Sequence, residues 1–177
     1  MQLKYLTDLD LSKRKVMLRT DMNVPLKDGN ILNEERIDRS LPTIKYILEQ
    51  GAQLILLSHL GRPKAGKIQK EFSLKPVAKS LEKKLNLTIE LKGSLADLSS
   101  REESLVMLEN IRFFEGEENN DSNFSRELAS HCDVFIMDAF ATSHRAHAST
   151  TGIINFADFS CAGFLIKEEL QALEKIN

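Results

Sequence analysis

Short, nearly uninterrupted apolar runs alternate along this chain with segments whose apolar residues recur every three or four positions. The first pattern is typical of strands buried on both faces of a parallel sheet, and the second is typical of amphipathic helices. The alternation predicts a doubly wound, mostly parallel α/β sheet of the Rossmann-like kind. Strands are expected at residues 15–19, 53–58, 88–91, 105–108 and 134–137, and helices at residues 40–50, 73–85, 124–130 and 167–176.

Capping residues set the expected limits of the helices. Ser40 is of a type preferred at an N-cap, Pro42 is tolerated in a first turn, and Gly51 suits the position after a helix end. Ser73 is expected to cap the next helix in the same way. The last helix, KEELQALEKI, carries Glu-to-Lys pairs and is expected to be exposed.

Composition narrows the class of protein. The chain has 177 residues, enough for one domain with a sizeable core, and its formal net charge of −2 gives no indication of nucleic acid or an anionic membrane as partner. No apolar run reaches the length of a membrane span, and the first residues lack an apolar signal core. Two distant cysteines, Cys132 and Cys161, suggest neither a disulfide framework nor a zinc site. A cytoplasmic protein is the default expectation.

The strand expected at residues 134–137 changes character abruptly at its carboxyl end. The apolar run VFIM is followed by DAFATSHRAHAST, which concentrates carboxylate, hydroxyl, imidazole and guanidinium groups. Open α/β sheets build ligand sites from the loops at strand carboxyl ends. A capped, solvated loop is the alternative interpretation, but similar polar bursts follow three other strands of this chain.

An arginine follows each of four strands, and parallel strands bring their carboxyl ends to one edge of a sheet. Four guanidinium groups are therefore expected to converge on one crevice, where they repel one another unless an anion binds. Planar guanidinium groups suit carboxylate and phosphate, so the expected ligand is small and multiply anionic. The four are Arg36, Arg62, Arg112 and Arg145.

Asp21, Asn23 and His59 occupy the same loops and could exchange hydrogen bonds with hydroxyl groups of such a ligand. The alternative is that each arginine pairs with a nearby surface acid, such as Glu35 or Glu115. Pairing of all four arginines in this way is the weaker interpretation.

Two familiar motifs are incomplete. Residues 61–67, GRPKAGK, have the spacing of a phosphate-binding P-loop, but Ile68 stands where that loop needs Ser or Thr, and the next helix is expected only from Ser73. His144 and His147 could share a helical face as metal ligands, but no third ligand suggests itself, so no metal site is expected. No G-x-G-x-x-G dinucleotide fingerprint is present.

The chain resembles the N-terminal domain of the phosphoglycerate kinase family. SHLGRP and HRAHAS are the most specific of the matching segments, which follow the family's order over nearly the whole chain. They are RTDMNVPLKDG at 19–29, ERI at 35–37, LPTIKYILEQGAQLILLSHLGRPK at 41–64, FSLKPVAKSLEKKL at 72–85, LENIRFFEGEENND at 108–121, MDAFATSHRAHASTTGI at 137–153 and AGFLIKEELQAL at 162–173.

The resemblance implies binding of 3-phosphoglycerate or 1,3-bisphosphoglycerate. Asp21 and Asn23 would hold the glycerate part, and Arg36 would stabilise the phosphoryl group in transit. The other residues that it implies are His59 and Arg62 in contact with the substrate, Arg112 and Arg145 with Arg62 in the basic patch for the phosphate, and Met22, Leu60 and Gly61 in the substrate loops.

The resemblance also implies an enzyme of glycolysis that moves a phosphoryl group between 1,3-bisphosphoglycerate and ADP, with ATP formed and magnesium bound to the nucleotide. In the family a second domain carries that nucleotide, and its glycine-rich stretches are not found here. Residues 1–165 are expected to be the substrate-binding domain and residues 166–177 the start of the interdomain helix. We therefore expect a monomer that binds substrate, carries no nucleotide or metal of its own, and does not turn over alone. A free-standing binding module for small phosphorylated acids and a nucleotide-binding regulator are the alternatives.

Four residues depart from the family's pattern without removing a charged contact. Thr20 and Met22 replace the usual Val and Phe around Asp21, and Ala141 and Ser143 replace the usual Gly and Ala. A positive φ at Ala141 would penalise its side chain.

Overall fold

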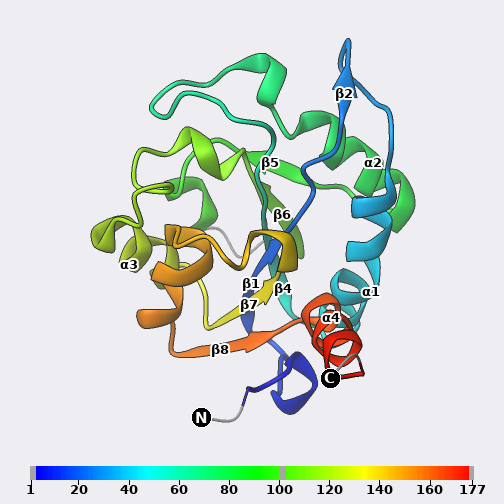
Figure 1. Cartoon of the computed structure of the whole chain (residues 1–177), viewed down its shortest axis with the longest axis vertical. Helices are drawn as coiled ribbons and strands as arrows, with labels where there is room; N and C mark the ends of the chain where they lie inside the picture. The colour runs from blue at the N-terminus through cyan, green and yellow to red at the C-terminus, as the bar shows by residue number, and fades with distance from the viewer. Residues whose placement is uncertain (1–2, 100–102, 176–177) are drawn as a thin grey trace.

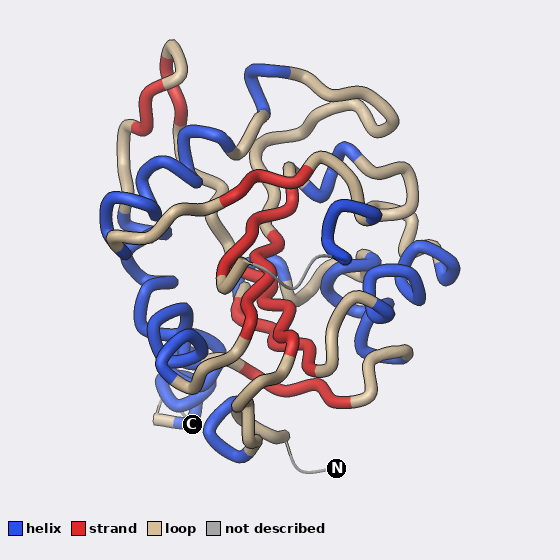
Figure 2. The backbone as a smooth tube through the Cα atoms, turned by 180° about the vertical axis from the view of Figure 1, so that it is seen from behind, coloured by secondary structure: helices blue, strands red, loops and turns tan. Residues whose placement is uncertain are grey.

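A computed structural model describes residues 3–99 and 103–175, and its centre is a six-stranded sheet in which all paired neighbours run parallel (Figures 1 and 2). The strand order is β5-β6-β4-β1-β7-β8, and a two-stranded antiparallel hairpin stands apart from it. The strands of the sheet are β1 (Lys15–Thr20), β4 (Gln53–Leu57), β5 (Glu90–Lys92), β6 (Leu105–Leu108), β7 (Val134–Asp138) and β8 (Phe159–Ala162), and those of the hairpin are β2 (Leu26–Lys27) and β3 (Asn30–Ile31).

The apolar runs form strands because both faces of the sheet are covered. β6 and β7 are buried along their whole length, and β1 and β4 along all but their first residue. These four strands confirm the sequence-based expectation, and β5 lies within two residues of its expected position. β8 was not expected, because four residues with an exposed Phe159 at the sheet's edge give too weak a pattern.

Helices cover both faces of the sheet, as expected for a doubly wound fold. Figure 1 shows α1, α2 and α4 on one side of the strands and α3 on the other. Two short turns of helix, η6 (Ala148–Gly152, a π-helix) and η7 (Ile153–Asn155), lie on the α3 side. The α-helices are α1 (Glu35–Glu49), α2 (Lys75–Leu85), α3 (Ser122–Ser130) and α4 (Phe164–Glu174).

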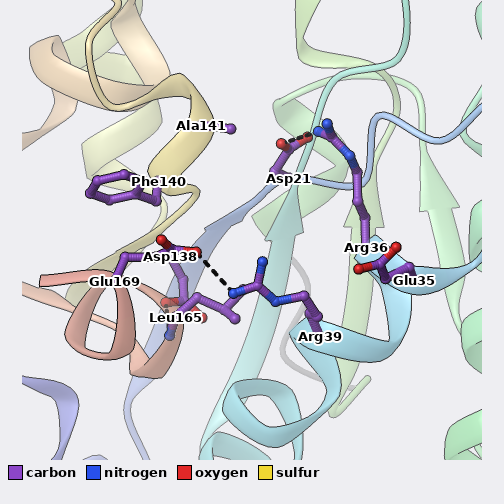
Figure 3. A pocket seen from close by; sticks show the side chains of 9 residues that line it. All are labelled: Asp21, Glu35, Arg36, Arg39, Asp138, Phe140, Ala141, Leu165 and Glu169. Carbon is purple, nitrogen blue, oxygen red and sulfur yellow. Dashed lines mark hydrogen bonds and ion pairs between the residues drawn. The ribbon is translucent and has the colours of Figure 1, made fainter. Parts of the chain in front are cut away.

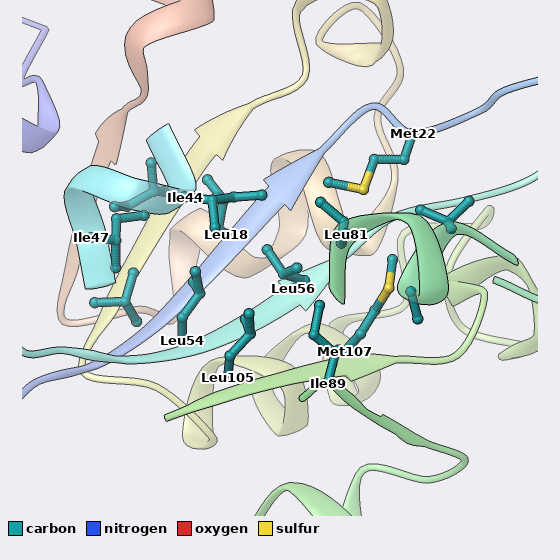
Figure 4. Packing of buried hydrophobic residues seen from close by; sticks show 14 of the residues in the cluster. Leu18, Met22, Ile44, Ile47, Leu54, Leu56, Leu81, Ile89, Leu105 and Met107 are labelled. Atoms are coloured by element: carbon teal, nitrogen blue, oxygen red, sulfur yellow. The ribbon is translucent and has the colours of Figure 1, made fainter. Parts of the chain in front are cut away.

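The core therefore has two apolar layers, one on each face. On the α1 and α2 face, strand residues such as Leu18 and Leu56 meet Ile44 and Ile47 of α1 and Leu81 of α2 (Figure 4). The opposite layer contains the alternate strand residues, with helix residues of α3 and η7 packed on them: Met17, Ile55, Leu57, Phe135, Leu128 and Ile153. Alternation along each strand thus decides which layer a side chain joins.

The expected start of α1 was wrong. The helix begins at Glu35, after Asn33 Oδ1 accepts a hydrogen bond from the Glu35 amide at 2.8 Å. Ser40 is buried inside the helix, and its hydroxyl donates to the Arg36 carbonyl at 3.0 Å instead of capping an end. Pro42 therefore lies in the helix interior, where its ring removes one main-chain hydrogen bond. Arg36 consequently sits on the first turn of α1 and not in a loop.

The last helix is also docked more closely than expected. α4 begins at Phe164, whose ring lies edge-on to Tyr46 of α1 with 5.2 Å between the ring centroids. Glu169 of α4 accepts a hydrogen bond from Arg39 of α1 at 3.0 Å. Among the described residues, the acidic groups of α4 form no ion pairs with lysines of the same helix, and residue 176 lies outside them. Packing on α1 thus replaces the expected pairing along an exposed helix.

Parallel pairing places the loops after β1, β4, β6 and β7 at one edge of the sheet. The chain leaves β1 toward β4 on one side and leaves β7 toward β8 on the other, so β1 and β7 flank the topological switch point. A crevice for ligands is expected outside the carboxyl ends of such a strand pair. Within the described residues, no helix is long and apolar enough to cross a membrane.

Candidate functional site

A cleft of about 300 Å³ opens beside the switch point, between α1, α4 and the loop after β7 (Figure 3). Asp21 follows β1 on one side of it, and Arg36 projects from the first turn of α1. The Arg36 guanidinium donates to the Asp21 carboxylate in an ion pair. Of the residues predicted for the site, only these two line the cleft, whose other lining residues are Glu35, Arg39, Asp138, Phe140, Ala141, Leu165 and Glu169.

Gly61 joins two other predicted residues, Asn23 and Arg112. Its amide donates to Asn23 Oδ1 at 2.8 Å, and its carbonyl accepts from Arg112 Nη1 at 2.6 Å. Gly61 has a φ of +62°, and a Cβ there would lie 2.5 Å from the ring of Phe72, so only glycine fits. The loops after β1, β4 and β6 therefore meet at one backbone position, as the sequence analysis expected.

The pKa of His59 reflects the positive charge of the arginines around it. It is 3% exposed, and its pKa is lowered to about 2 by burial and then by the positive charges of Arg19, Arg112, Arg145 and Arg36. Such a cationic surrounding keeps the imidazole neutral at physiological pH. Three of the four predicted arginines, Arg36, Arg112 and Arg145, thus act on a single ring, together with Arg19, which was not predicted, and without Arg62.

The arginines of this cluster differ in how they are paired. Arg36 is bound to Asp21, and Arg112 lies 3.4 Å from Glu118. Arg112 is 4% exposed, and its buried Nε has no hydrogen-bond partner. Burial lowers the pKa of Arg112, and the charge of Arg145 lowers it further.

Arg62, which is exposed, and Arg145, which is half-buried, have no ion pair with a carboxylate within the described part of the chain. The alternative of pairing with Glu35 or Glu115 is therefore wrong in its partners, and it does not account for two of the four arginines. Excess positive charge at this edge is the condition for binding an anion.

Sequence reasoning missed Arg19. This arginine is the fifth residue of β1, is 1% exposed, and donates to Ser149, to the Thr20 carbonyl and to His59. A charged residue inside the run KVMLRT was the available signal, because an arginine rarely occupies a strand buried on both faces.

Two of the predicted loop residues lie in the core. Met22 is fully buried and Leu60 is 4% exposed, and both pack in the layer under α1 and α2. Their side chains anchor the loops, and their backbone is held as well: the Met22 amide donates to Ser58 Oγ, and the Leu60 carbonyl accepts from Asn110. Ala141 has no positive φ, because residues Phe140–Thr142 form a 3-10 turn. The backbone strain considered for this alanine is therefore absent. The Ser143 hydroxyl donates to the Phe140 carbonyl at 2.7 Å.

The P-loop interpretation lacks its structural context. A P-loop runs directly into the N-terminus of an α-helix, whereas the helix after residues 61–67 is α2, which begins only at Lys75. Across residues 3–99 and 103–175, no three His, Cys, Asp or Glu side chains are grouped to hold a metal ion.

Comparison with known proteins decides the family. The family model described as Phosphoglycerate kinase matches residues 6–177. The chain belongs to the phosphoglycerate kinase family. A curated phosphoglycerate kinase of Coxiella burnetii (strain RSA 493 / Nine Mile phase I) is 47% identical over 171 residues, which make up 96% of this chain and 44% of that protein.

Solved structures of the phosphoglycerate kinase family have the same fold. The enzyme from Coxiella burnetii superposes with a TM-score of 0.94 at 46% identity, over 98% of this chain and 45% of that one. The phosphoglycerate kinase from Pyrococcus horikoshii OT3 superposes with a TM-score of 0.85 at 28% identity, again over 98% of this chain and 45% of its own. This chain therefore spans under half the length of the phosphoglycerate kinases that it matches.

Proposed function

We propose that this chain is the substrate-binding half of a phosphoglycerate kinase, a phosphotransferase of glycolysis, and that it binds 3-phosphoglycerate or 1,3-bisphosphoglycerate at the edge where β1, β4, β6 and β7 end. One observation supports the proposal most directly. Within a member of this family, Arg19, Arg36, Arg112 and Arg145 act electrostatically on the neutral His59, and neither Arg145 nor the nearby loop residue Arg62 has an ion pair with a carboxylate among the described residues. A small ligand with two or more negative charges would relieve their mutual repulsion.

Each predicted residue has a role that its position allows. Arg62, Arg112 and Arg145 would receive the phosphate, because Arg62 and Arg112 are joined to the Gly61 loop and Arg145 acts electrostatically on Arg112. Asp21 and Asn23 would bind the glycerate hydroxyl and carboxylate end, with Asp21 free to accept from a hydroxyl once Arg36 turns away.

Arg36 would be the catalytic residue. It is half-exposed at the mouth of the cleft, so its guanidinium can leave Asp21 for negative charge that develops on the oxygens of the transferring phosphoryl group. Transfer between an acyl phosphate and a nucleotide requires positioning and charge stabilisation more than covalent chemistry. The residues of this chain would supply the first substrate, its orientation and part of that stabilisation.

Mg-ATP or Mg-ADP would bind to the remainder of a full-length enzyme. The chain spans 44% of its curated relative and has no glycine-rich nucleotide stretch, so it is expected to bind the phosphorylated acid alone without turnover. A cytoplasmic location remains the prediction from composition, and a monomeric state remains the prediction from the family resemblance.

Calorimetric titration of the purified chain tests the proposal. Saturable, salt-sensitive binding of 3-phosphoglycerate is expected, with much weaker binding of glycerate and of inorganic phosphate, because each lacks one of the two anionic ends. Mg-ATP is the control ligand and should release or absorb no binding heat. Binding of Mg-ATP with no binding of 3-phosphoglycerate would contradict the proposal.

A further inference from the structure

The hydrogen bonds of His59 fix which of its nitrogens carries the proton. Arg19 Nη2 lies 3.2 Å from His59 Nδ1, and a guanidinium can only donate hydrogen bonds. His59 Nδ1 must therefore accept, which leaves the proton of the neutral ring on Nε2. An imidazole in this form offers a ligand oxygen a donor and cannot act there as a base.

Arg19 is itself held by a directed chain of hydrogen bonds. Its Nε donates to Ser149 Oγ at 2.9 Å, and Ser149 Oγ donates to Glu117 Oε1 at 2.6 Å. The directions follow from the groups, because the guanidinium has no acceptor and the carboxylate has no donor. The order Glu117–Ser149–Arg19–His59 thus runs from the loop after β6 to the loop after β4.

The buried charges of Glu117 and Arg19 compensate each other. Glu117 and Ser149 are fully buried and Arg19 is 1% exposed, so neither charge is solvated by water. Burial lowers the pKa of Arg19, and the negative charge of Glu117 is the largest influence raising it. Ser149 bridges the two groups, so neutralising Glu117 removes the strongest compensation of the buried Arg19 charge and is expected to disturb the structure around it.

Glu117 also fixes the segment that follows Arg145. Its second carboxylate oxygen accepts from the Ser149 amide at 2.9 Å, and its backbone carbonyl accepts from the Ala148 amide at 2.9 Å. These amides open the π-helix η6, and an acid at that position satisfies donors that the helix leaves free. One glutamate therefore holds both the arginine behind His59 and the base of the Arg145 loop.

We propose that Glu117 is a positioning residue of the phosphoglycerate site: through Ser149 it holds Arg19, which presents His59 as an Nε2–H donor to the bound ligand. The inference rests on the proposed function for the identity of the ligand, but the state of His59 is a property of the free chain.

A pure charge effect and a positioning role predict opposite changes in ligand affinity when Glu117 is neutralised. Removing a negative charge beside an arginine cluster should tighten binding of an anion if the carboxylate acts only through space. Loss of positioning should weaken that binding. Glu118 is the matched control, because it belongs to the same loop, lies 3.4 Å from Arg112 and is exposed.

The test uses the 177-residue chain, with calorimetry for 3-phosphoglycerate and nitrogen-15 NMR of the imidazoles, in which His59 is assigned by comparison with His59→Gln. In the wild type, His59 should show the Nε2–H tautomer. Glu117→Gln should bind roughly tenfold more weakly, as when a charge-assisted hydrogen bond is lost. Glu118→Gln should bind as tightly as the wild type or more tightly.

Ser149→Ala keeps the inference testable if Glu117→Gln does not fold. This variant changes no charge, and it should mix the two tautomers of His59 and weaken binding roughly tenfold. Ser143→Ala is its control in the segment after β7, because the Ser143 hydroxyl donates to the nearby Phe140 carbonyl and to no site residue within the described part of the chain.

Two results would overturn the inference. One is an Nδ1–H tautomer of His59 in the wild type, and the other is binding by folded Glu117→Gln, or by Ser149→Ala, that equals or exceeds the wild type. If the wild type binds no 3-phosphoglycerate, the proposed function fails separately. The inference is then decided by the imidazole spectra, since an unchanged His59 tautomer in Ser149→Ala would contradict it.

Discussion

Arg19 and Asp138 are buried charges at the carboxyl ends of neighbouring strands, on opposite faces of the sheet. Arg19 continues the face of Met17, toward η6, and Asp138 continues the face of Ile136, toward α1. They are satisfied in different ways. Among the described residues, Asp138 accepts hydrogen bonds from neutral donors of α1 and α4, whereas the bonds of Arg19 lead to His59 and, through Ser149, to a buried glutamate.

The Asp138 carboxylate connects three elements of the fold by hydrogen bonds. It accepts from the Thr43 hydroxyl at 2.6 Å and from the Leu165 amide at 2.8 Å, so it joins β7, α1 and the first turn of α4. A Cβ at Gly163 would lie 2.2 Å from the Asp138 Cγ, which shows how closely the chain passes this group. The comparison indicates two uses of a buried charge. Asp138, whose oxygens accept from helix donors, stabilises the fold, whereas Arg19, which lies behind the cluster of arginines around His59, serves the binding of a ligand.

Replacing Asp138 should have the largest effect on stability. Asp138→Ala leaves a buried hydroxyl and two amides without an acceptor, so the free energy of unfolding should fall by about 2–4 kcal/mol. Urea denaturation measures this loss, and Thr43→Val, which removes one of the bonds, should cost about 1 kcal/mol. Affinity of the folded variant for 3-phosphoglycerate should stay within about twofold of the wild type. A tenfold loss of affinity would remove the distinction between the two sites.

Replacing Arg145 should do the reverse. Arg145→Ala should weaken 3-phosphoglycerate binding by about 10–100-fold, the range expected for a hydrogen bond to a charged group. The free energy of unfolding should be unchanged or slightly higher, because one of several repelling cations is gone. Arg126→Ala is the matched control, because it removes an arginine of α3 that is not part of the predicted site. The Arg126 guanidinium lies 4.7 Å from the centroid of the Phe156 ring. Equal losses of affinity in both variants would show only a general effect of net charge.

The contributions of His59 and Asp138 to stability should depend on pH in opposite directions. The pKa of His59 is lowered from 6.5 to about 2, so between these values the unfolded chain binds a proton that the folded chain does not. This group should therefore make stability rise with pH up to about 6.5, by at most about 1.4 kcal/mol per pH unit, and stay constant above. Burial raises the pKa of Asp138, so its contribution falls as pH rises from its ordinary value of 3.8.

Urea titrations from about pH 4 to 8 measure these slopes. His59→Gln should flatten the rise below about pH 6.5, and Asp138→Asn should remove the opposing fall at lower pH. A wild-type slope that His59→Gln leaves unchanged would mean that the imidazole titrates normally in the folded chain.

The smallest effect is expected at Ala141, at the mouth of the cleft beside Asp21. Because its φ is not positive, Ala141→Gly gains no relief of strain and should cost at most about 1 kcal/mol of stability through added backbone freedom. Thermal unfolding measures this cost. A stabilised variant would show that the loop needs glycine after all.

Most of the fold could be predicted from the sequence because buried parallel strands leave an unambiguous apolar signal. β8 and the first turn of α1 could not. The first is short and exposed at one end, and the second was hidden because Ser40 resembles a cap but is bonded inside the helix. Local chemistry cannot distinguish those two uses of a serine.

The candidate site could be predicted in part for a similar reason. Loops at the carboxyl ends of parallel strands converge, so arginines such as Arg36 and Arg145 could be grouped without a structure. Arg19 and Glu117 could not be linked, since their connection runs through Ser149 and depends on side-chain packing between β1, η6 and the loop after β6. Periodicity contains no information on such bonds.

Chemical-shift mapping of the backbone amides during a titration with 3-phosphoglycerate tests the central claim most directly. The account predicts that amides near Asn23, Gly61, Arg112 and Arg145 shift together and fit one dissociation constant, because four loops form one site. Shifts confined to a single loop, or located in the apolar groove beside β8 around Phe159, would contradict it.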